Sequence, residues 1–178
     1  MMIRHLLLLA LIPLAVACAG REPADFAGKE PRLLPEAFFA GPTRGWGMIE
    51  DRFGGVRSQF TVELNGRWDG KTLILDEDFR YDSGRTQKRQ WHLVKTGAGT
   101  YEGRAGDVPG VAIGTISGNT FNLRYPLVIP RGEGTLTVDV DDWLFLQPDG
   151  VAINRAALSK FGVDVGEITL FIQRPAAR

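Results

Sequence analysis

Residues 72–93 read TLILDEDFRYDSGRTQKRQWHL, in which apolar and polar side chains alternate on both sides of a short turn. One face of the first run carries the odd-numbered residues Leu73, Leu75, Glu77, Phe79 and Tyr81. Asp82, Ser83 and Gly84 between the runs are residue types that favour a tight turn. Alternation with a period of two is typical of a strand with one buried face, so this stretch predicts a β-hairpin.

The pairing across this turn determines which side chains share the inner face. With residues 82–84 as the loop, three pairs lie opposite each other: Phe79 with Gln87, Glu77 with Arg89, and Leu75 with Trp91. An acid and a base would then meet on an apolar face, where burial raises the pKa of Glu77 and Arg89 lowers it. Two interpretations remain open: an ion pair that fixes the strand register, or a polar anchor for the head of an apolar ligand.

The preceding strand connects through Asp69-Gly70, a sequence that favours a two-residue hairpin turn. This loop predicts three more pairs: Leu64 with Leu75, Val62 with Glu77, and Phe60 with Phe79. Both hairpins therefore turn the same odd-numbered face of the middle strand toward apolar partners.

Short apolar runs separated by turn residues continue to the end of the chain. They predict strands over residues 111–117, 120–128, 135–147, 151–158 and 167–174. One helical turn is expected at residues 35–39, where Pro35 begins it and Gly41 ends it. Eight or more strands at hairpin spacing predict an all-β antiparallel barrel or sandwich. We favour an up-and-down β-barrel because closure removes exposed strand edges.

Several inward-facing positions are candidates for a ligand site. Alternation with Leu144 turns Asp142 toward the interior. A buried carboxylate needs a partner, and three basic residues are available: Arg124, Arg155 and Lys160. Ala112 and Gly114 would leave room inside the barrel, although large cross-strand partners could fill the same space. The candidate ligand-binding residues are Glu77, Phe79, Tyr81, Arg89, Trp91, Tyr125 and Asp142.

The composition limits the chemistry of the chain. Its 178 residues contain 21 Lys and Arg against 21 Asp and Glu, and this balance argues against a nucleic-acid binder. The single cysteine excludes a disulfide framework and a multi-cysteine metal site. Beyond residue 17, His92 is the only histidine and the strand pattern turns it outward, so neither a catalytic triad nor a zinc site is expected. We predict no catalytic residue, no metal and no cofactor.

The N-terminus carries a processing signal. Residues 1–17 have a short basic start and an apolar run that is shorter than the roughly 20 apolar residues needed to span a bilayer. The run ends in Leu14-Ala15-Val16-Ala17-Cys18, which resembles the lipobox of bacterial lipoproteins, where a diacylglycerol-bearing cysteine follows the cleavage site. An ordinary secretory signal is the alternative. We expect lipidation at Cys18, a lipidated N-terminus and tether over residues 18–31, and a barrel domain over residues 32–178.

Motifs spread along the mature chain match one family. They are Phe38-Phe39-Ala40-Gly41, Trp46-Gly47, Asp51-Arg52-Phe53-Gly54, Asp76-Glu77-Asp78-Phe79-Arg80-Tyr81, Arg89-Gln90-Trp91, Asp141-Asp142-Trp143-Leu144 and Ser159-Lys160-Phe161-Gly162. With these motifs the chain resembles an uncharacterised family of bacterial lipoproteins, domain-of-unknown-function family 3833. The resemblance implies a lipocalin-like fold and a lipid-anchored place in the cell envelope, but no activity. Because Ala19 follows Cys18, the sorting pattern of Gram-negative bacteria indicates the periplasmic face of the outer membrane.

These expectations combine into a leading hypothesis and two alternatives. The leading hypothesis is a non-enzymatic, lipid-anchored periplasmic barrel that binds or carries an apolar small molecule, such as a fatty acyl or isoprenoid lipid. The first alternative is a structural lipoprotein whose filled barrel docks another envelope protein. The second is an enzyme that uses Glu77 or Asp142 in a cavity. The expected partners are the membrane, through acylated Cys18, and the small molecule; no protein partner is identified.

Overall fold

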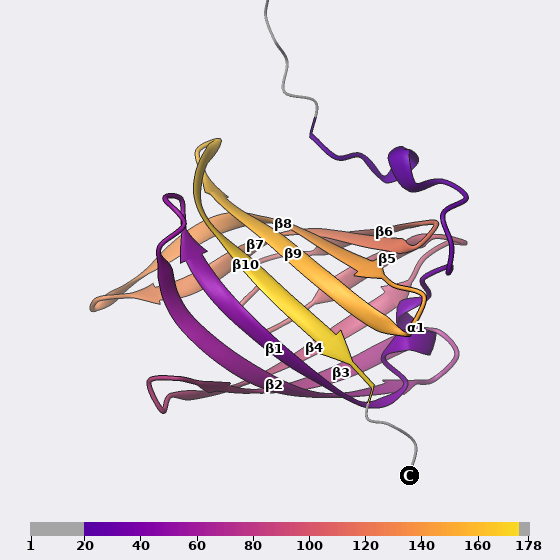
Figure 1. The fold of residues 1–178 in the computed structure, drawn as a ribbon, viewed down its shortest axis with the longest axis horizontal. Helices are drawn as coiled ribbons and strands as arrows, with labels where there is room; N and C mark the ends of the chain where they lie inside the picture. Colours follow the sequence, from indigo (N-terminus) through magenta and orange to yellow (C-terminus); the bar gives the residue numbers. More distant parts are fainter. Residues whose placement is uncertain (1–19, 175–178) are drawn as a thin grey trace, which may run out of the picture.

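The alternating segments form ten strands that close into a barrel, shown in Figure 1. This computed structural model describes residues 20–174, so the expected signal, Cys18 and residues 175–178 lie outside the described part. The strands are β1 (Gly41–Asp51), β2 (Val56–Trp68), β3 (Thr72–Tyr81), β4 (Thr86–Lys95), β5 (Thr100–Arg104), β6 (Ala112–Ser117), β7 (Thr120–Arg131), β8 (Gly134–Leu146), β9 (Val151–Lys160) and β10 (Val163–Gln173). Within residues 20–174, no helix is long and apolar enough to cross a membrane.

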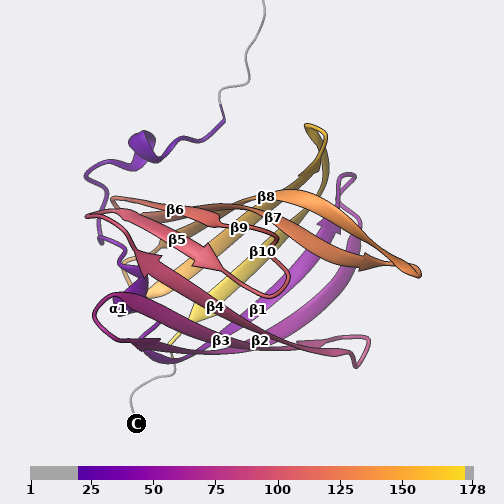
Figure 2. The ribbon, with the colours of Figure 1, turned by 180° about the vertical axis from the view of Figure 1, so that it is seen from behind.

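Each strand pairs with its neighbours in the sequence, and β1 pairs with β10 to close the barrel. Every one of these pairings is antiparallel. The closing pairs run from Arg44 with Gln173 to Asp51 with Gly166. Figure 2 shows the barrel from behind, where β3, β4 and β5 form the wall that completes the ring. The predicted all-β, up-and-down antiparallel barrel is confirmed.

Two of the strands, β1 and β5, were not predicted. β1 carries Gly41, Gly45 and Gly47, which interrupt the alternation of apolar and polar side chains. Gly47 makes room for a neighbour, because a Cβ atom there would lie 2.4 Å from Cζ of Phe60 on β2. The barrel therefore closes over the Phe60 ring at a position without a side chain, which a hydropathy pattern does not reveal. β5 has five residues, too few to display a clear period.

The β3–β4 hairpin has the predicted register, with Glu77 opposite Arg89. The β2–β3 register was predicted wrongly, by two residues. The observed pairs are Leu64 with Glu77, Val62 with Phe79, and Phe60 with Tyr81. Because side chains alternate with a period of two, a shift of two residues leaves every side chain on its predicted face. The inward-facing set of β3 is therefore as expected.

The Asp69 carboxylate accounts for the shift. Its Oδ1 accepts hydrogen bonds from the backbone N–H groups of Lys71 and Thr72, at 2.8 and 2.7 Å. This local network places Trp68 opposite Leu73, so the connection is longer than the two-residue turn that Asp69-Gly70 predicted.

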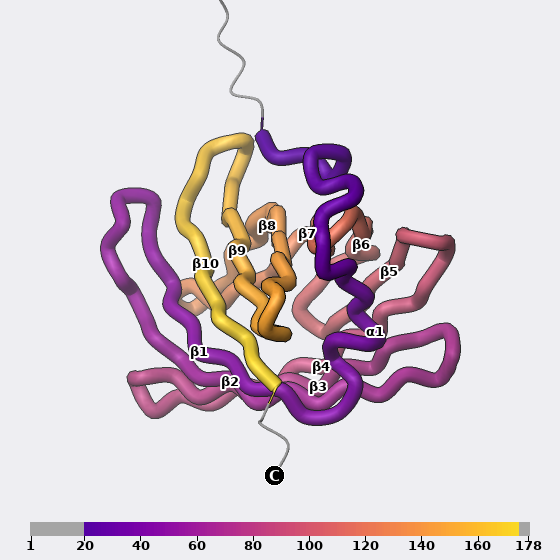
Figure 3. The backbone as a smooth tube through the Cα atoms, turned by 45° about the vertical axis from the view of Figure 1, so that its right-hand side comes forward, coloured from indigo at the N-terminus to yellow at the C-terminus, as the bar shows by residue number. Residues whose placement is uncertain are grey.

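The short helix α1 (Pro35–Phe38) closes one end of the barrel, as Figures 1 and 3 show. Pro35 and Phe38 are buried there, and Leu33 just before them is fully buried. This confirms the helical turn predicted near Pro35. The β1–β2, β3–β4, β7–β8 and β9–β10 hairpins turn at the opposite end (Figure 2). The barrel therefore has a helix-covered end and an end formed by hairpin tips.

Residues 20–33 run along the outside of the barrel. The 3-10 helix η1 (Pro23–Phe26) places the Phe26 ring 5.4 Å from the Trp143 ring and 5.5 Å from the Phe145 ring. Trp143 faces away from the barrel interior, yet it is only 1% exposed because this segment covers it. The backbone N–H of Leu33 donates to the carbonyl of Gly118 at 2.9 Å. The described part of the expected tether is thus packed against the barrel.

Candidate functional site

The barrel encloses a cavity of about 520 Å³. Its walls are mostly apolar side chains that the strands turn inward, including Phe60, Leu75, Trp91, Leu123, Leu144 and Leu170. All seven candidate residues line this one cavity: Glu77, Phe79, Tyr81, Arg89, Trp91, Tyr125 and Asp142. Cavities of roughly 300–1,000 Å³ are typical of small-molecule sites. The structure therefore brings the candidates together, and their role in binding remains a prediction.

The exposure of the lining side chains locates the mouth of the cavity. Toward the end that α1 covers, the lining residues Phe39, Leu93 and Phe121 are only 3–6% exposed. Lining residues toward the hairpin tips are half-buried: Ile49, Phe79, Tyr81, Gln87, Ile129 and Ile168. The guanidinium of Arg85 lies 3.6 Å from the centroid of the Tyr81 ring at this end. The cavity therefore opens toward the hairpin tips and is closed by α1.

Three charged side chains meet inside the cavity. Arg89 Nε lies 3.5 Å from Glu77 Oε2 and 3.6 Å from Asp107 Oδ1, and the three side chains are 12–23% exposed. The predicted Glu77–Arg89 pair is confirmed. Asp107 was missed because it lies in the connection between β5 and β6, where no alternation indicates direction. Its backbone carbonyl accepts a hydrogen bond from Val128 N–H at 2.9 Å, which fixes this connection against β7.

Part of the hydrogen-bonding capacity of this cluster is unused within the described part of the chain. Among the buried side-chain atoms without a hydrogen-bond partner there, three belong to it: Glu77 Oε2, Arg89 Nε and Asp107 Oδ1. Each ion pair brings the charges close without the geometry of a hydrogen bond. A buried polar atom without a partner costs about 1–3 kcal/mol, so a polar group that reached these atoms would be bound favourably.

Asp142 supplies a second polar group on the opposite wall. Tyr125 Oη donates to its Oδ2 at 3.3 Å, and the amide of Asn154 donates to its Oδ1. The inward direction of Asp142 was predicted correctly, but the predicted partners Arg124, Arg155 and Lys160 were wrong. Arg124 and Arg155 point outward, where they pair with Asp141 and Glu167. A neutral amide and a phenol therefore hold Asp142 in place of a base.

The electrostatic balance of the cavity is acidic. Burial raises the pKa of Glu77 to about 7; Arg89 opposes this rise, and Asp142 and Asp107 add to it. Burial likewise raises the pKa of Asp142 to about 6, against the lowering effect of Asn154 and Arg89. Burial lowers the pKa of Arg89, but Tyr125, Glu77 and Asp107 together raise it more, so the guanidinium stays charged. Three carboxyl groups thus surround one permanent positive charge.

Aromatic rings hold the guanidinium in position. Its central carbon lies 4.5 Å from the centroid of the Trp91 ring and 5.7 Å from that of Tyr125. The two rings meet edge to face at 5.1 Å. A cation over a desolvated aromatic face is stabilised by about 2 kcal/mol, so Arg89 is a fixed part of the wall.

The described residues that line the cavity include no Ser, Thr, Cys, His or Lys. Within residues 20–174, no group of three or more His, Cys, Asp or Glu side chains is arranged to hold a metal ion. His92 is exposed on the outside of β4, as predicted, with its Nε2 2.8 Å from Gln90 Oε1. The chemistry available in the cavity is therefore carboxylic acid, guanidinium, phenol and amide.

Comparison with known proteins gives a family and a fold. A family model described as "Protein of unknown function (DUF3833)" matches residues 12–174. A search of curated proteins finds no match. The structure of the S-type phycobiliprotein lyase CPES from Guillardia theta is similar, with a TM-score of 0.60 and 11% sequence identity over 83% of this chain and 96% of that chain. This similarity supports the lipocalin-like barrel.

Proposed function

The chain belongs to the DUF3833 family of unknown function, and we propose that it binds an apolar small molecule inside its barrel. The observation that carries this proposal is the cavity of about 520 Å³, whose apolar walls surround three buried polar atoms without partners in the described chain. An elongated apolar molecule would replace water along the walls, and its polar head would reach Glu77, Arg89 and Asp107.

The charges of Glu77, Arg89 and Asp107 limit which chemical groups can form the polar head of the ligand. A carboxylate or phosphate would meet Glu77, Asp107 and Asp142 around a single guanidinium, and like charges at close range oppose binding. A head that donates hydrogen bonds, such as an alcohol, an amide or an amine, would instead satisfy the free carboxylate oxygens. We therefore propose an apolar ligand with a neutral or cationic donor head.

We further propose that the protein works at a membrane surface of the cell envelope, through diacylglycerol on Cys18 and at the periplasmic face of the outer membrane. The lipobox-like sequence and the family resemblance support this placement. The similarity to a phycobiliprotein lyase supports the same fold in this chain, and we assign no activity from it. We propose binding without catalysis, because the lining residues offer no covalent nucleophile of the Ser, Cys or Lys type.

One observation favours a second candidate function. Glu77 and Asp142 have pKa values of about 7 and 6, and carboxyl groups with such pKa values can exchange protons with a bound molecule near neutral pH. Acid–base chemistry on the ligand is therefore the alternative. Mass spectrometry of a ligand before and after incubation with the protein decides between binding and catalysis, because only catalysis changes the ligand chemically.

Competition between matched ligands tests the binding proposal. Hexadecanol, hexadecylamine and hexadecanoic acid have equal chain lengths and different heads, and each is titrated against an apolar fluorescent probe in the barrel at pH 8. We expect the alcohol and the amine to bind at least about tenfold more tightly than the acid, a difference of about 1.4 kcal/mol. Glu77→Gln should reduce this preference, whereas Asp78→Asn, on the outer face of the same strand, should not.

Two outcomes would contradict the proposal at different levels. Tightest binding by hexadecanoic acid would contradict the donor-head class and leave the cavity as a binding site. If none of the three molecules bound, and native mass spectrometry of the purified protein showed no retained molecule, binding itself would be contradicted. That result would favour the alternative of a structural lipoprotein that docks another envelope protein.

A further inference from the structure

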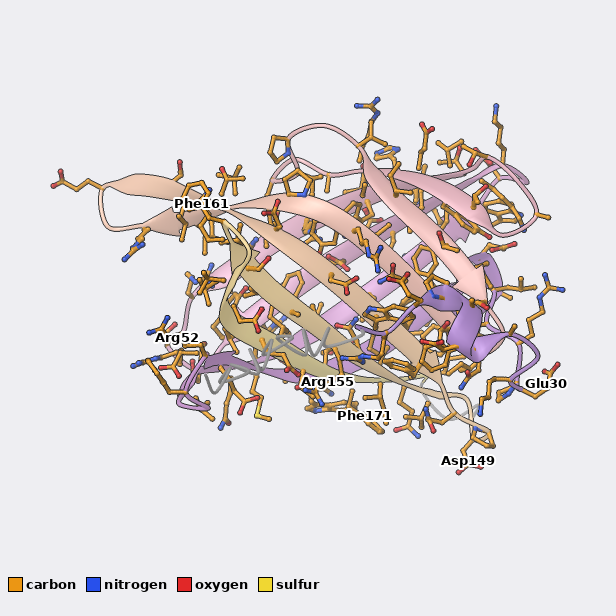
Figure 4. All side chains as sticks on the ribbon, turned by 90° about the horizontal axis from the view of Figure 1, so that it is seen from above. Glu30, Arg52, Asp149, Arg155, Phe161 and Phe171 are labelled. Carbon is orange, nitrogen blue, oxygen red and sulfur yellow. The ribbon has the colours of Figure 1, made fainter. Side chains whose placement is uncertain are left out.

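The two most exposed large apolar side chains of the described residues lie at neighbouring hairpin tips. Phe53, between β1 and β2, is 81% exposed, and Phe161, between β9 and β10, is 89% exposed. Their hairpins are adjacent because β1 pairs with β10 as far as Asp51 and Gly166. Figure 4 shows Arg52 and Phe161 toward one end of the barrel, and Asp149 at the other. Two aromatic rings are thus presented together at the hairpin end.

The backbone of Phe161 is in a conformation that favours glycine. Its φ angle is 53°, and it is the only residue other than glycine with positive φ in the described part of the chain. A bulky side chain is rare in this region, where glycine or asparagine is the usual residue. Almost the whole ring is exposed, so packing within the described barrel does not explain a phenylalanine at this tip.

Each ring carries a cation beside it. The guanidinium of Arg52 lies 4.6 Å from the centroid of the Phe53 ring, and Lys160 Nζ lies 4.7 Å from that of Phe161. Asp51 in the first tip is neutralised by an ion pair with Arg57. Aromatic rings flanked by Arg or Lys are typical of the boundary between lipid headgroups and acyl chains, where the ring is buried and the cation meets phosphate.

The position of the N-terminal segment indicates where a bilayer would lie. Arg21 and Phe26 fix this segment to the outside of β8 through the rings of Trp143 and Phe145. Cys18 precedes Gly20 by two residues, which span at most about 7 Å of chain. Figures 1, 2 and 3 show the described segment beginning on the side of the barrel toward which the β9–β10 tip rises. A bilayer that holds acyl chains on Cys18 would therefore lie beside this tip.

One apolar pair lies between the tips and the cavity. Ile49 on β1 pairs with Ile168 on β10, and both line the cavity near its mouth. These residues lie between the tips and the interior, on the two strands that carry the tips. An apolar molecule that passes between the acyl chains and the cavity at this place would contact both isoleucines.

We propose that the β1–β2 and β9–β10 tips insert into the interfacial layer of a phospholipid bilayer, so that the cavity exchanges its ligand directly with the membrane. This inference rests on the proposed lipid anchor and on ligand binding in the barrel. Phe53 and Phe161 enter the acyl boundary, while Arg52 and Lys160 stay at the phosphates.

Site-specific quenching tests the insertion with the whole acylated protein in vesicles of phosphatidylethanolamine and phosphatidylglycerol. Because Cys18 is acylated, Phe53→Cys, Phe161→Cys and Asp149→Cys each introduce one free thiol for a fluorescent label. We expect lipids brominated along the acyl chain to quench the labels at 53 and 161, and not the label at 149. An unquenched label at 161 on vesicle-bound protein would overturn the proposal, and crosslinking of that label to one envelope protein would favour a protein partner instead.

A second variant separates this inference from the proposed function. Phe53→Ser combined with Phe161→Asn removes both rings, and asparagine tolerates the positive φ angle at 161. Hexadecanol binding in detergent should be unchanged, whereas hexadecanol transfer between vesicle and protein should slow by roughly tenfold. Unchanged transfer would overturn insertion alone. Absence of binding by the native chain would instead show that the proposed function has failed.

Discussion

Two buried clusters in this barrel combine the same kinds of side chain with opposite results. At the helix-covered end, Glu36 of α1 accepts a hydrogen bond from Lys95 Nζ at 2.6 Å and another from Tyr101 Oη at 2.5 Å. In the cavity, Glu77 faces Arg89 at 3.5 Å without a hydrogen bond. Both clusters pair a carboxylate with a base beside an aromatic residue, but only the first has complete partners.

The difference is visible in the pKa of each carboxyl group. Burial raises the pKa of Glu36, but the hydrogen bonds from Lys95 and Tyr101 lower it more, so the net pKa falls. Burial dominates at Glu77, and its pKa rises to about 7. The first cluster fastens α1 over the barrel end, whereas the second retains hydrogen-bonding capacity for a molecule from outside. This contrast separates a structural acid from a candidate binding acid.

Removal of the structural acid should have the largest effect on stability. Glu36→Ala leaves Lys95 and the Tyr101 hydroxyl without their acceptor, so we expect the free energy of unfolding to fall by about 3 kcal/mol. Urea unfolding at pH 7 measures this change. Glu36→Gln, which keeps one acceptor oxygen, should lose less, and hexadecanol affinity should be unchanged in both variants. A loss below about 1 kcal/mol in Glu36→Ala would remove the contrast between the clusters.

The binding acid should make the protein less stable as pH rises. Because the folded-state pKa of Glu77, about 7, exceeds its unfolded value of 4.5, the contribution of this group is complete below pH 4.5 and is lost as pH rises through 7. We expect a loss on the order of 2–3 kcal/mol that is absent from Glu77→Gln. Urea unfolding from pH 4 to pH 8 measures it.

Glu36→Gln is the control for this pH dependence, because the sign at Glu36 is reversed. Its folded-state pKa is lowered, so its contribution is present above the unfolded value of 4.5 and is lost as pH falls through the folded value. The substitution should flatten only the acid side of the profile. A native profile that Glu77→Gln does not alter would show that Glu77 is ionised as freely in the cavity as in the unfolded chain.

Ligand affinity should show the smallest of the three effects. As pH rises from 5 to 8, Glu77 becomes a carboxylate, while hexadecylamine stays cationic. We expect its affinity to increase by about tenfold over this range in the native protein and to stay level in Glu77→Gln. Titration with the fluorescent probe measures both. Affinity that falls as pH rises would place the amine head away from this carboxylate.

Strand alternation predicted the inward-facing site residues on the strands, but it did not predict the loop residue Asp107 or the strand β1 that closes the barrel. The inward positions of Glu77, Arg89 and Asp142 follow from a period of two, which survives even a register shift caused by Asp69. Asp107 could not be predicted, because the direction of a loop residue depends on tertiary contacts such as the hydrogen bond from Val128. β1 was missed because glycines interrupt its alternation, and one of them, Gly47, leaves room for the Phe60 ring.

The partner of Asp142 could not be predicted for a related reason. A basic partner was predicted because a buried carboxylate is expected to pair with a positive charge. The structure uses Asn154, whose neutral amide gives no such signal in a sequence. Strand direction is a local property, whereas the choice of partner across a barrel depends on how several strands are aligned.

The packing of η1 on Trp143 limits how far the barrel could move away from its proposed lipid anchor. With Cys18 acylated as proposed, the segment packed against β8 leaves only a very short linker between the lipid anchor and the barrel. The barrel could rock and diffuse laterally in one leaflet, but it could not cross an aqueous compartment to a second bilayer. A carrier of this geometry would serve its own membrane, and any long-distance relay of its cargo would need a separate, freely diffusing acceptor.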